Sequence, residues 1–247
     1  MYEVARVLYG SQNLGLSGPD SDKDYKVLLC PTYKDLYNFH KAEKGDLTNF
    51  DHEHYSPIDV RQFNKLVLKC NPNILETLFS VEWDYIDKRL ETYVKCAQML
   101  LRQGYLALYW KEFYAAMTGL VLNSLKRYGE TNPKSVSRAC YLFNLTNHLA
   151  ANDFSLDYLT WRNNFYSDYS RDIRFNSDAY DLQAISDSVK YHLEDKKEEF
   201  QRRADSWCYD HNSGNDYLVD TLNMKAVNLN KLMYDFVKAR IQEEFNK

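Results

Sequence analysis

The sequence has little of the cysteine patterning that marks small metal-bound or disulfide-linked proteins. Its five cysteines stand singly along the chain, at Cys30, Cys70, Cys96, Cys140 and Cys208, and no Cys-x-x-Cys pair occurs. Without paired thiols, neither a structural zinc site nor a disulfide framework is expected. The composition therefore predicts free thiols and a reducing, cytoplasmic location.

Long hydrophobic runs and a secretory leader are also missing. No window approaches the run of about 18 apolar residues that a membrane-spanning helix needs. The first residues, MYEVARVLYG, lack the basic region and apolar core of a signal peptide. The sequence predicts that no membrane is among the partners of this protein.

An excess of positive charge is absent as well. The 247 residues carry 31 Lys and Arg against 35 Asp and Glu, which gives a formal net charge of −4. The average charge therefore does not favour strong electrostatic binding of long nucleic acid, although local basic clusters are present. The balance favours a small or specific acceptor.

Glycine and proline become scarce in the second half of the chain. All five prolines and seven of the eight glycines precede residue 134, and only Gly214 follows. The second half can therefore form long helices, whereas turns are concentrated in the first half. We expect an α+β fold, in which a small mixed sheet with flanking helices occupies residues 1–84 and an all-helical domain that closes the active-site cleft occupies residues 85–247.

Hydrophobic periodicity gives the expected elements of both parts. In the first part we expect strands near 4–9, 24–30 and 51–56, with a short helix over 11–17 between the first two. Pro57 is expected to end the third strand and Ser56 to cap a helix over 57–69. In the second part we expect helices near 86–103, 105–127, 135–151 and 181–207 and a final helix through 222–237, whereas 152–177 shows no assignable pattern.

The segment Val7–Lys26 carries the clearest chemical signature. A strand-like run ends at Gly10-Ser11, where glycine allows a sharp turn with exposed N–H groups that suit phosphate oxygens. Asp22 and Asp24 then stand at the start of a second strand, so both carboxylates point to the same face. Two carboxylates on one face suit Mg²⁺ when a nucleotide's phosphates complete its coordination. The segment predicts metal-dependent nucleotidyl transfer.

The same segment resembles the nucleotidyltransferase superfamily of DNA polymerase β. The signature of that superfamily is an apolar residue, Gly-Ser or Gly-Gly, and then Asp-x-Asp or Asp-x-Glu, and Tyr9-Gly10-Ser11 with Asp22-Lys23-Asp24 fits it. Two segments are also similar to the GSxxxGLxxPxSDxDxK and NPNxLExL motifs of predicted bacterial and phage nucleotidyltransferases. These segments are GSQNLGLSGPDSDKDYK and KCNPNILETLFS. The resemblance is good over residues 4–80 and weak beyond them.

This resemblance implies a reaction and a set of site residues. A nucleoside triphosphate would donate its nucleoside monophosphate to a hydroxyl of an RNA end, a protein side chain or a small molecule, with two Mg²⁺ (or Mn²⁺) ions and release of pyrophosphate. The implied catalytic residues are Asp22, Asp24, Asp51 and Glu53, of which Asp22, Asp24 and Asp51 bind metal. The implied nucleotide-binding residues are Gly10, Ser11, Asn13, Lys26, Lys134 and Arg138.

The third carboxylate of the cluster is expected in the strand near 51–56. Asp51, Glu53 and Tyr55 share one face of that strand, and His52, His54 and Ser56 share the other. If the acidic face meets Asp24, Asp51 or Glu53 completes a two-metal site, with a slight preference for Asp51. A zinc cluster built on His52 and His54 is a weaker alternative, because no second ligand pair stands at the required spacing.

A helix of the second part is expected to supply cations to the phosphates. In related proteins such a helix carries His and Arg, and the comparable segment here is Pro133–Tyr141. Lys134, Arg138 and Tyr141 lie on one face of that helix, but the expected His is missing. A solvated helix face is the alternative interpretation.

Two other function classes remain open. A nucleotide-binding sensor or interaction partner without turnover would keep the phosphate loop but would not need a complete set of acids. An RNA-binding protein could use the tyrosines of the helical half, among 21 in the chain, for base stacking. The acidic net charge argues against the second class. The sequence does not indicate the acceptor, the base or the oligomeric state.

Overall fold

A five-stranded mixed sheet forms the base of the molecule. The computed structural model describes residues 1–19, 21–38, 47–49, 53–157, 164–212 and 217–246. The strands are β1 (Tyr2–Tyr9), β2 (Lys23–Cys30), β3 (Leu47–Asn49), β4 (Glu53–Asp59) and β5 (Trp83–Tyr85), in the order β3-β4-β2-β1-β5. β2 pairs antiparallel with β1 and parallel with β4, while β1–β5 and β3–β4 are antiparallel. The expected α+β class with a small mixed sheet is confirmed.

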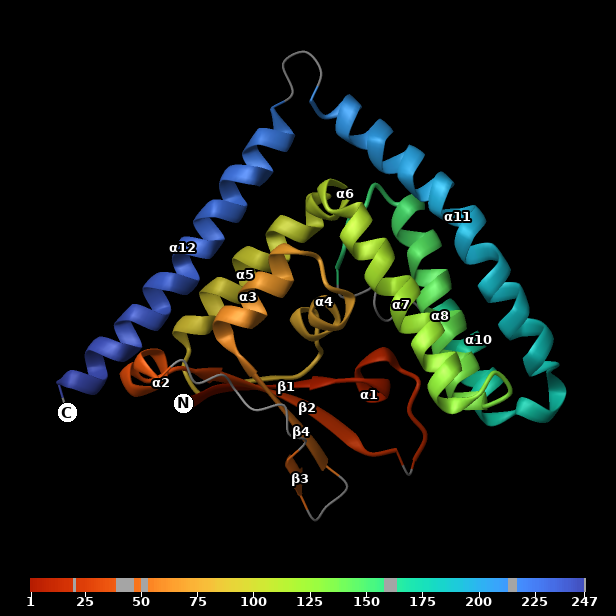
Figure 1. Ribbon diagram of the computed structural model, residues 1–247, viewed down its shortest axis with the longest axis horizontal. Coiled ribbons are helices and arrows are strands. Elements are labelled where there is room, and N and C mark those ends of the chain that lie inside the picture. Colours follow the sequence, from red (N-terminus) through yellow and green to blue (C-terminus); the bar gives the residue numbers. More distant parts are fainter. Residues whose placement is uncertain (20, 39–46, 50–52, 158–163, 213–216, 247) are drawn as a thin grey trace.

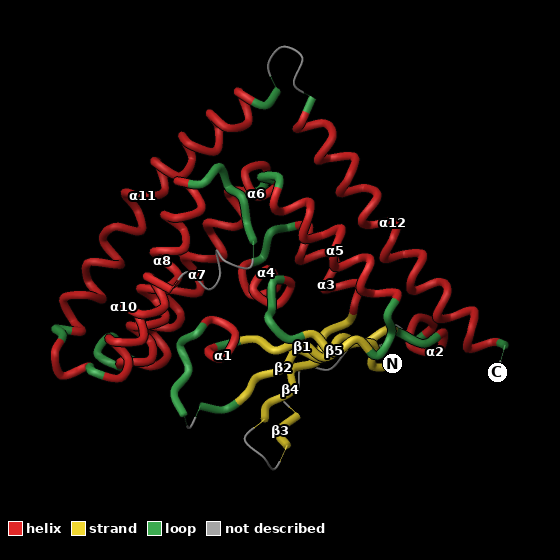
Figure 2. Tube along the Cα trace, turned by 180° about the vertical axis from the view of Figure 1, so that it is seen from behind, coloured by secondary structure: helices red, strands yellow, loops and turns green. Residues whose placement is uncertain are grey.

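The described helices lie on one face of this sheet (Figure 1; Figure 2). The helices of the first part are α1 (Ser11–Leu14), α2 (Tyr33–Tyr37), α3 (Val60–Leu68) and α4 (Pro72–Leu78). α3 and α4 pack on the strands through apolar side chains that include Phe63, Val67 and Leu75, which are fully buried. The residues of β1 and β2 that face these helices are buried too, so this covered face is the core face of the sheet.

The chain then continues as helices, as expected from its loss of glycine and proline. These are α5 (Arg89–Arg102), α6 (Tyr105–Leu108), α7 (Trp110–Tyr128), α8 (Pro133–Ala151), α10 (Asn164–Phe175), the 3-10 turn η1 (Ser177–Ala179), α11 (Leu182–Asp210) and α12 (Leu218–Phe245). α7, α8 and α11 pack side by side, with α10 against α8, while α12 lies across α3 and α5 (Figure 1). No helix in the part of the chain that is described is both long and apolar enough to cross a membrane.

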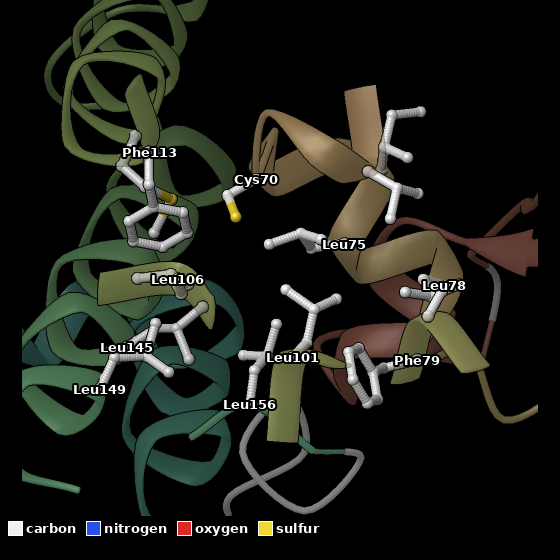
Figure 3. Packing of buried hydrophobic residues seen from close by; sticks show 14 of the residues in the cluster. Cys70, Leu75, Leu78, Phe79, Leu101, Leu106, Phe113, Leu145, Leu149 and Leu156 are labelled. Atoms are coloured by element: carbon white, nitrogen blue, oxygen red, sulfur yellow. The ribbon is translucent and has the colours of Figure 1, made fainter. Parts of the chain in front are cut away.

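One hydrophobic core runs through both parts of the chain. Leu75 and Phe79 from α4 and its C-terminal end lie close to Leu101 from α5, and Leu106 and Phe113 lie beyond them (Figure 3). These five side chains are at most 2% exposed. The boundary expected at residue 84 falls inside β5, which belongs to the sheet. The sheet part and the helical part therefore share a core rather than meeting at a polar linker.

The end of the third expected strand is corrected by the structure. β4 continues through Pro57 to Asp59, and Asp59, not Ser56, caps α3 by accepting a hydrogen bond of 2.8 Å from the Arg61 backbone N–H. Pro57 pairs with Val27 of β2 inside this strand, so the proline does not end it.

Two further differences concern the helical part. The helix expected over 105–127 is divided into α6 and α7 at Tyr109, whose φ of −118° is not helical. Residues 152–177, to which the sequence analysis assigned no element, contain α10, whose Ile173 is fully buried against the core.

Candidate functional site

The candidate site lies where β1 ends and β2 begins, on the covered face of the sheet. Tyr9 pairs with Asp24 across β1 and β2, and Gly10 follows directly. Gly10 has φ 77° and ψ −153°, a conformation that essentially only glycine adopts. The predicted sharp turn after the first strand is therefore present, and it brings the Gly10 backbone against the Asp24 carboxylate.

The backbone N–H of Gly10 differs from the expectation, because it is used inside the protein. It donates a hydrogen bond of 2.5 Å to Glu76 Oε1, a buried contact between the turn and α4. Ser11, half-buried at the start of α1, remains at the surface of the turn. The sequence predicted that both N–H groups face a phosphate, whereas the Gly10 N–H instead fixes the turn to α4.

Replacing Gly10 by alanine is expected to cost stability and to disturb the site. A Cβ atom on Gly10 would lie 2.7 Å from Asp24 Oδ2, and the backbone conformation would be strained. We expect a loss of about 1–3 kcal/mol in the free energy of unfolding, measured with urea. Gly119→Ala is the matched control, because Gly119 lies inside α7 with no atom within 4 Å of an added Cβ. That control should be neutral or stabilising by up to about 1 kcal/mol, and equal losses in the two variants would contradict the role assigned to Gly10.

Asp22 and Asp24 lie together at the start of β2, as predicted. Asp22 directly precedes the strand and Asp24 is its second residue. Burial raises the pKa of the Asp24 carboxyl, the charges of His54 and Lys134 oppose that rise, and the neighbouring Asp22 charge adds to it. Asp24 Oδ1 lies 3.5 Å from His54 Nδ1. A cation placed between the two acids would stabilise the charged form of such a carboxyl, because it offsets both the burial and the like charge of the neighbouring acid.

The parallel register decides which residue of β4 meets Asp24. Asp24 pairs with His54, and Glu53 pairs with Lys23. Residues paired across a sheet share a face, so Glu53 lies on the face opposite to Asp24. The Glu53 carboxylate accepts a hydrogen bond from the Tyr55 hydroxyl there. The expectation that the acidic face of this strand meets Asp24 is therefore wrong for Glu53, because the sequence does not reveal the register.

Asp51, the other expected third acid, and His52 of the zinc alternative lie outside the described residues. Within the described ranges, no group of three or more His, Cys, Asp or Glu side chains gathers into a metal site. Asp22 and Asp24 fit one Mg²⁺ or Mn²⁺ ion that phosphate oxygens complete, because they place two hard oxygen ligands on one face. A second ion would need a further acid at this end of the sheet.

Lys26 and Ser56 continue the same face of the sheet from Asp24 and His54. Lys26 Nζ donates a hydrogen bond of 2.9 Å to Ser56 Oγ and lies 4.4 Å from the centre of the Tyr9 ring. The Lys26 charge also lowers the pKa of the Glu76 carboxyl, although burial outweighs it. Lys26 is therefore at the site, as the sequence predicted.

Two cations of α8 reach the site from far along the chain. The charge of Lys134 lowers the pKa of the Asp24 carboxyl, and Arg138 Nη2 lies 4.0 Å from Glu76 Oε2. Both side chains retain solvent access, whereas Tyr141, expected on the same face, is only 1% exposed and belongs to the core. The structure thus brings Lys134 and Arg138 to the Asp24 site and leaves Tyr141 out of it.

Asn13 supports the site instead of facing a ligand. Its side chain is 1% exposed. The amide nitrogen donates a hydrogen bond of 3.1 Å to the Glu76 carbonyl oxygen, and the amide oxygen accepts one of 3.1 Å from the Val81 N–H. Both ends of the amide are therefore occupied by main-chain groups. Asn13 holds α1 against α4 and does not contact the solvent from which a nucleotide would enter.

Glu76 is the residue whose importance the sequence understated. Its side chain is 3% exposed, and burial raises its pKa against the opposing effects of Arg138, the Gly10 N–H and Lys26. A buried acid is costly unless it is paired, so its position points to a role. The signal in the sequence was an acidic residue on an otherwise apolar helix after Asn71-Pro72-Asn73.

No protein-family model, curated protein or solved structure matches this chain. The function of the site is therefore inferred from the residues that form it. These combine two neighbouring carboxylates, a buried acid and three cations around one glycine turn.

Proposed function

We propose that this protein is a metal-dependent nucleotidyltransferase that moves a nucleoside monophosphate from a nucleoside triphosphate to a hydroxyl acceptor. The observation that carries the proposal is the convergence of Lys134 and Arg138 from α8 on the end of β2 that holds Asp22 and Asp24. A metal-bound triphosphate needs two kinds of protein group. Carboxylates bind its metal ion, and cations bind its phosphates from the opposite side.

Each residue takes a role that follows from its place. Asp22 and Asp24 would hold Mg²⁺ or Mn²⁺, which supplies charge neutralisation and orientation of the phosphates when bound. Lys134 and Arg138 would contact the β- and γ-phosphates, together with the Ser11 hydroxyl at the turn. Lys26 would add positive charge beside the α-phosphate.

The reaction consists of in-line attack on the α-phosphorus. The acceptor hydroxyl passes its proton to solvent water as its oxygen bonds to the α-phosphorus, and the bond to the β-phosphate breaks with its electron pair leaving on pyrophosphate. Fixed positive charges stabilise the developing negative charge, so positioning and electrostatics supply most of the rate. The acceptor is an RNA end, a protein side chain or a small hydroxylated molecule, and the fold does not choose among them.

A nucleotide-binding protein without turnover is the second candidate. The observation that favours it is the position of Glu53, which leaves two carboxylates, Asp22 and Asp24, on the Asp24 face within the described part of the chain. Such a protein would bind a triphosphate with metal and release it unchanged. Incubation with labelled triphosphate and acceptors of the three classes separates this candidate from the enzyme.

Calorimetric titration with ATP, GTP, CTP and UTP tests the proposal directly. We expect one triphosphate to bind with Mg²⁺ and to bind at least about tenfold more weakly with excess chelator, because the metal cancels the repulsion between phosphates and Asp24. Lys134→Gln should weaken binding by a similar factor, whereas Lys197→Gln, which removes an exposed cation from α11, should not. If none of the four triphosphates binds with Mg²⁺ present, the proposal fails.

A further inference from the structure

A second groove lies away from the Asp24 site, between α3, α6 and α12. Its volume is about 750 Å³, in the range of ligand-binding clefts. We call it the α3–α12 groove. It is lined by Arg61, Asn64, Lys65, Leu68, Lys69, Tyr105, Tyr109, Asn223, Ala226, Val227, Asn230, Met233, Tyr234 and Val237.

One wall of this groove is a row of cations. Arg61 and Lys65 on α3 and Lys69 at its C-cap follow one another at four-residue spacing and are all exposed. Four residues of helix rise about 6 Å, so the three charges are spaced like successive phosphates of an extended strand. Asp59 pairs with Arg61, but no ion pair engages Lys65 or Lys69 among the described residues. No acidic side chain lines the groove in the described part of the chain.

The opposite wall, on α12, offers an aromatic ring and amides. Tyr234 is 64% exposed, although its neighbour Met233 on the same helix is buried in the floor. Asn230 Oδ1 accepts a hydrogen bond of 2.7 Å from Asn64 Nδ2. Asn64 Oδ1 in turn accepts a hydrogen bond of 2.9 Å from the Tyr93 hydroxyl. The buried Asn64 thus fixes the exposed Asn230 at the groove, where the amide N–H groups of Asn230 can donate to a ligand.

We propose that the α3–α12 groove binds single-stranded nucleic acid. Phosphates would follow Lys65 and Lys69, while bases would stack on Tyr234 and meet the amides of Asn223 and Asn230. Basic grooves with exposed aromatic rings are the usual surfaces for single strands. An acidic peptide helix fits less well, because amides interrupt the apolar floor on which its anchoring side chains would sit. The overall charge of −4 makes this basic row a local exception.

The groove and the Asp24 site are separate in the fold. Asp24 and its partner His54 stand at the start of β2 and β4, whereas α3 follows the far end of β4 at Asp59. Figure 1 shows α3 and α12 on one side of α4 and α1 on the other. The inference therefore does not rest on the proposed function, and its failure would leave that proposal standing.

Fluorescence anisotropy with a labelled single-stranded RNA of about twelve nucleotides tests the basic wall. Between about 50 and 200 mM salt, wild-type affinity should fall steeply. Lys65→Gln/Lys69→Gln should weaken binding at least about tenfold and lower the slope of log K against log salt by about 1.4, since two phosphate contacts are lost. The matched control is Lys197→Gln/Arg202→Gln, which removes two exposed cations from α11 and should change neither quantity.

The aromatic wall is tested in the same assay. Tyr234→Ala should weaken binding by about tenfold, whereas Tyr234→Phe should retain it, because the ring stacks and the hydroxyl does not. Thermal unfolding of each variant, and its calorimetric binding of triphosphate, show whether the fold and the Asp24 site are intact. The proposal is overturned if wild type does not bind the RNA at low salt, if both double variants lose affinity equally, or if polyglutamate competes as well as RNA.

Discussion

Asp24→Asn is expected to lower nucleotidyl transfer by about a thousandfold or more while leaving the fold intact. Asparagine has the shape of aspartate but lacks the charge that would hold the metal between Asp22 and Asp24. Removing a ligand that acts only with the reacting phosphates affects kcat as well as KM. The measurement is the initial rate of transfer from the triphosphate that calorimetry identifies, with its acceptor.

Stability should change in the opposite direction from activity. Burial raises the pKa of Asp24 in the folded protein, so the folded state binds this proton more tightly than the unfolded state. That carboxyl therefore contributes stability at acid pH, which is lost as the pH rises through the raised pKa. Asparagine removes this loss, so Asp24→Asn should be at least as stable as wild type at neutral pH.

Glu53→Gln is the matched control for this variant. Glu53 is one residue out of register with the partner of Asp24 and faces the other side of the sheet. Its replacement removes the same charge from a neighbouring strand and should leave the transfer rate within about twofold of wild type. Full activity of Asp24→Asn, or an equal loss in Glu53→Gln, would refute the assignment of the site.

The second large effect is expected at Glu76. Glu76→Ala leaves the Gly10 N–H without its partner and opens a cavity beneath the turn. Both effects are destabilising, and together they should cost about 2–4 kcal/mol in the free energy of unfolding. The turn would also lose its fixed position beside Asp24, so affinity for triphosphate should fall.

Glu76→Gln separates the hydrogen bond from the charge. Its carbonyl oxygen can still accept from Gly10, so most of the stability lost in Glu76→Ala should return. Burial raises the pKa of Glu76, so this carboxyl, too, contributes stability at acid pH that is lost as the pH rises through the raised value. The glutamine variant should therefore lose less stability than wild type between about pH 5 and pH 8.

Urea unfolding at several pH values checks both Glu76 variants. We expect the order wild type, Glu76→Gln, Glu76→Ala at acid pH, with the first two converging or crossing as the pH rises. Wild-type stability for Glu76→Ala would show that the contact with Gly10 does not hold the turn. A glutamine variant with the same pH dependence as wild type would show that the buried charge has no influence on stability.

Several parts of this protein follow from its sequence because they depend on near neighbours in the chain. The strand before Gly10, the turn itself and the common face of Asp22 and Asp24 come from local periodicity and from the conformational freedom of one glycine. The helical second part follows from the lack of glycine and proline after residue 134, and its buried stripe at Leu222–Val237 has clear helical spacing.

Other features depend on contacts between distant segments, and local patterns did not predict them. Pro57 was expected to end a strand, but the pairing of β4 with β2 continues through Pro57 to Asp59, and that pairing joins segments that are distant in the sequence. α10 was not assigned from the sequence, and it packs against α8 with Ile173 fully buried.

At the candidate site, the sequence by itself determined which chemical groups the chain offers, because motif residues lie within one turn and one strand. The tertiary structure decided which groups meet. Parallel register placed His54, not Glu53, beside Asp24, and a shift by one residue would have reversed the two. Packing of α8 and α4 brought Arg138 to Glu76 and gave the Gly10 N–H to that buried acid. Side-chain chemistry is thus local, whereas its pairing depends on register and helix packing, which are set by the core as a whole.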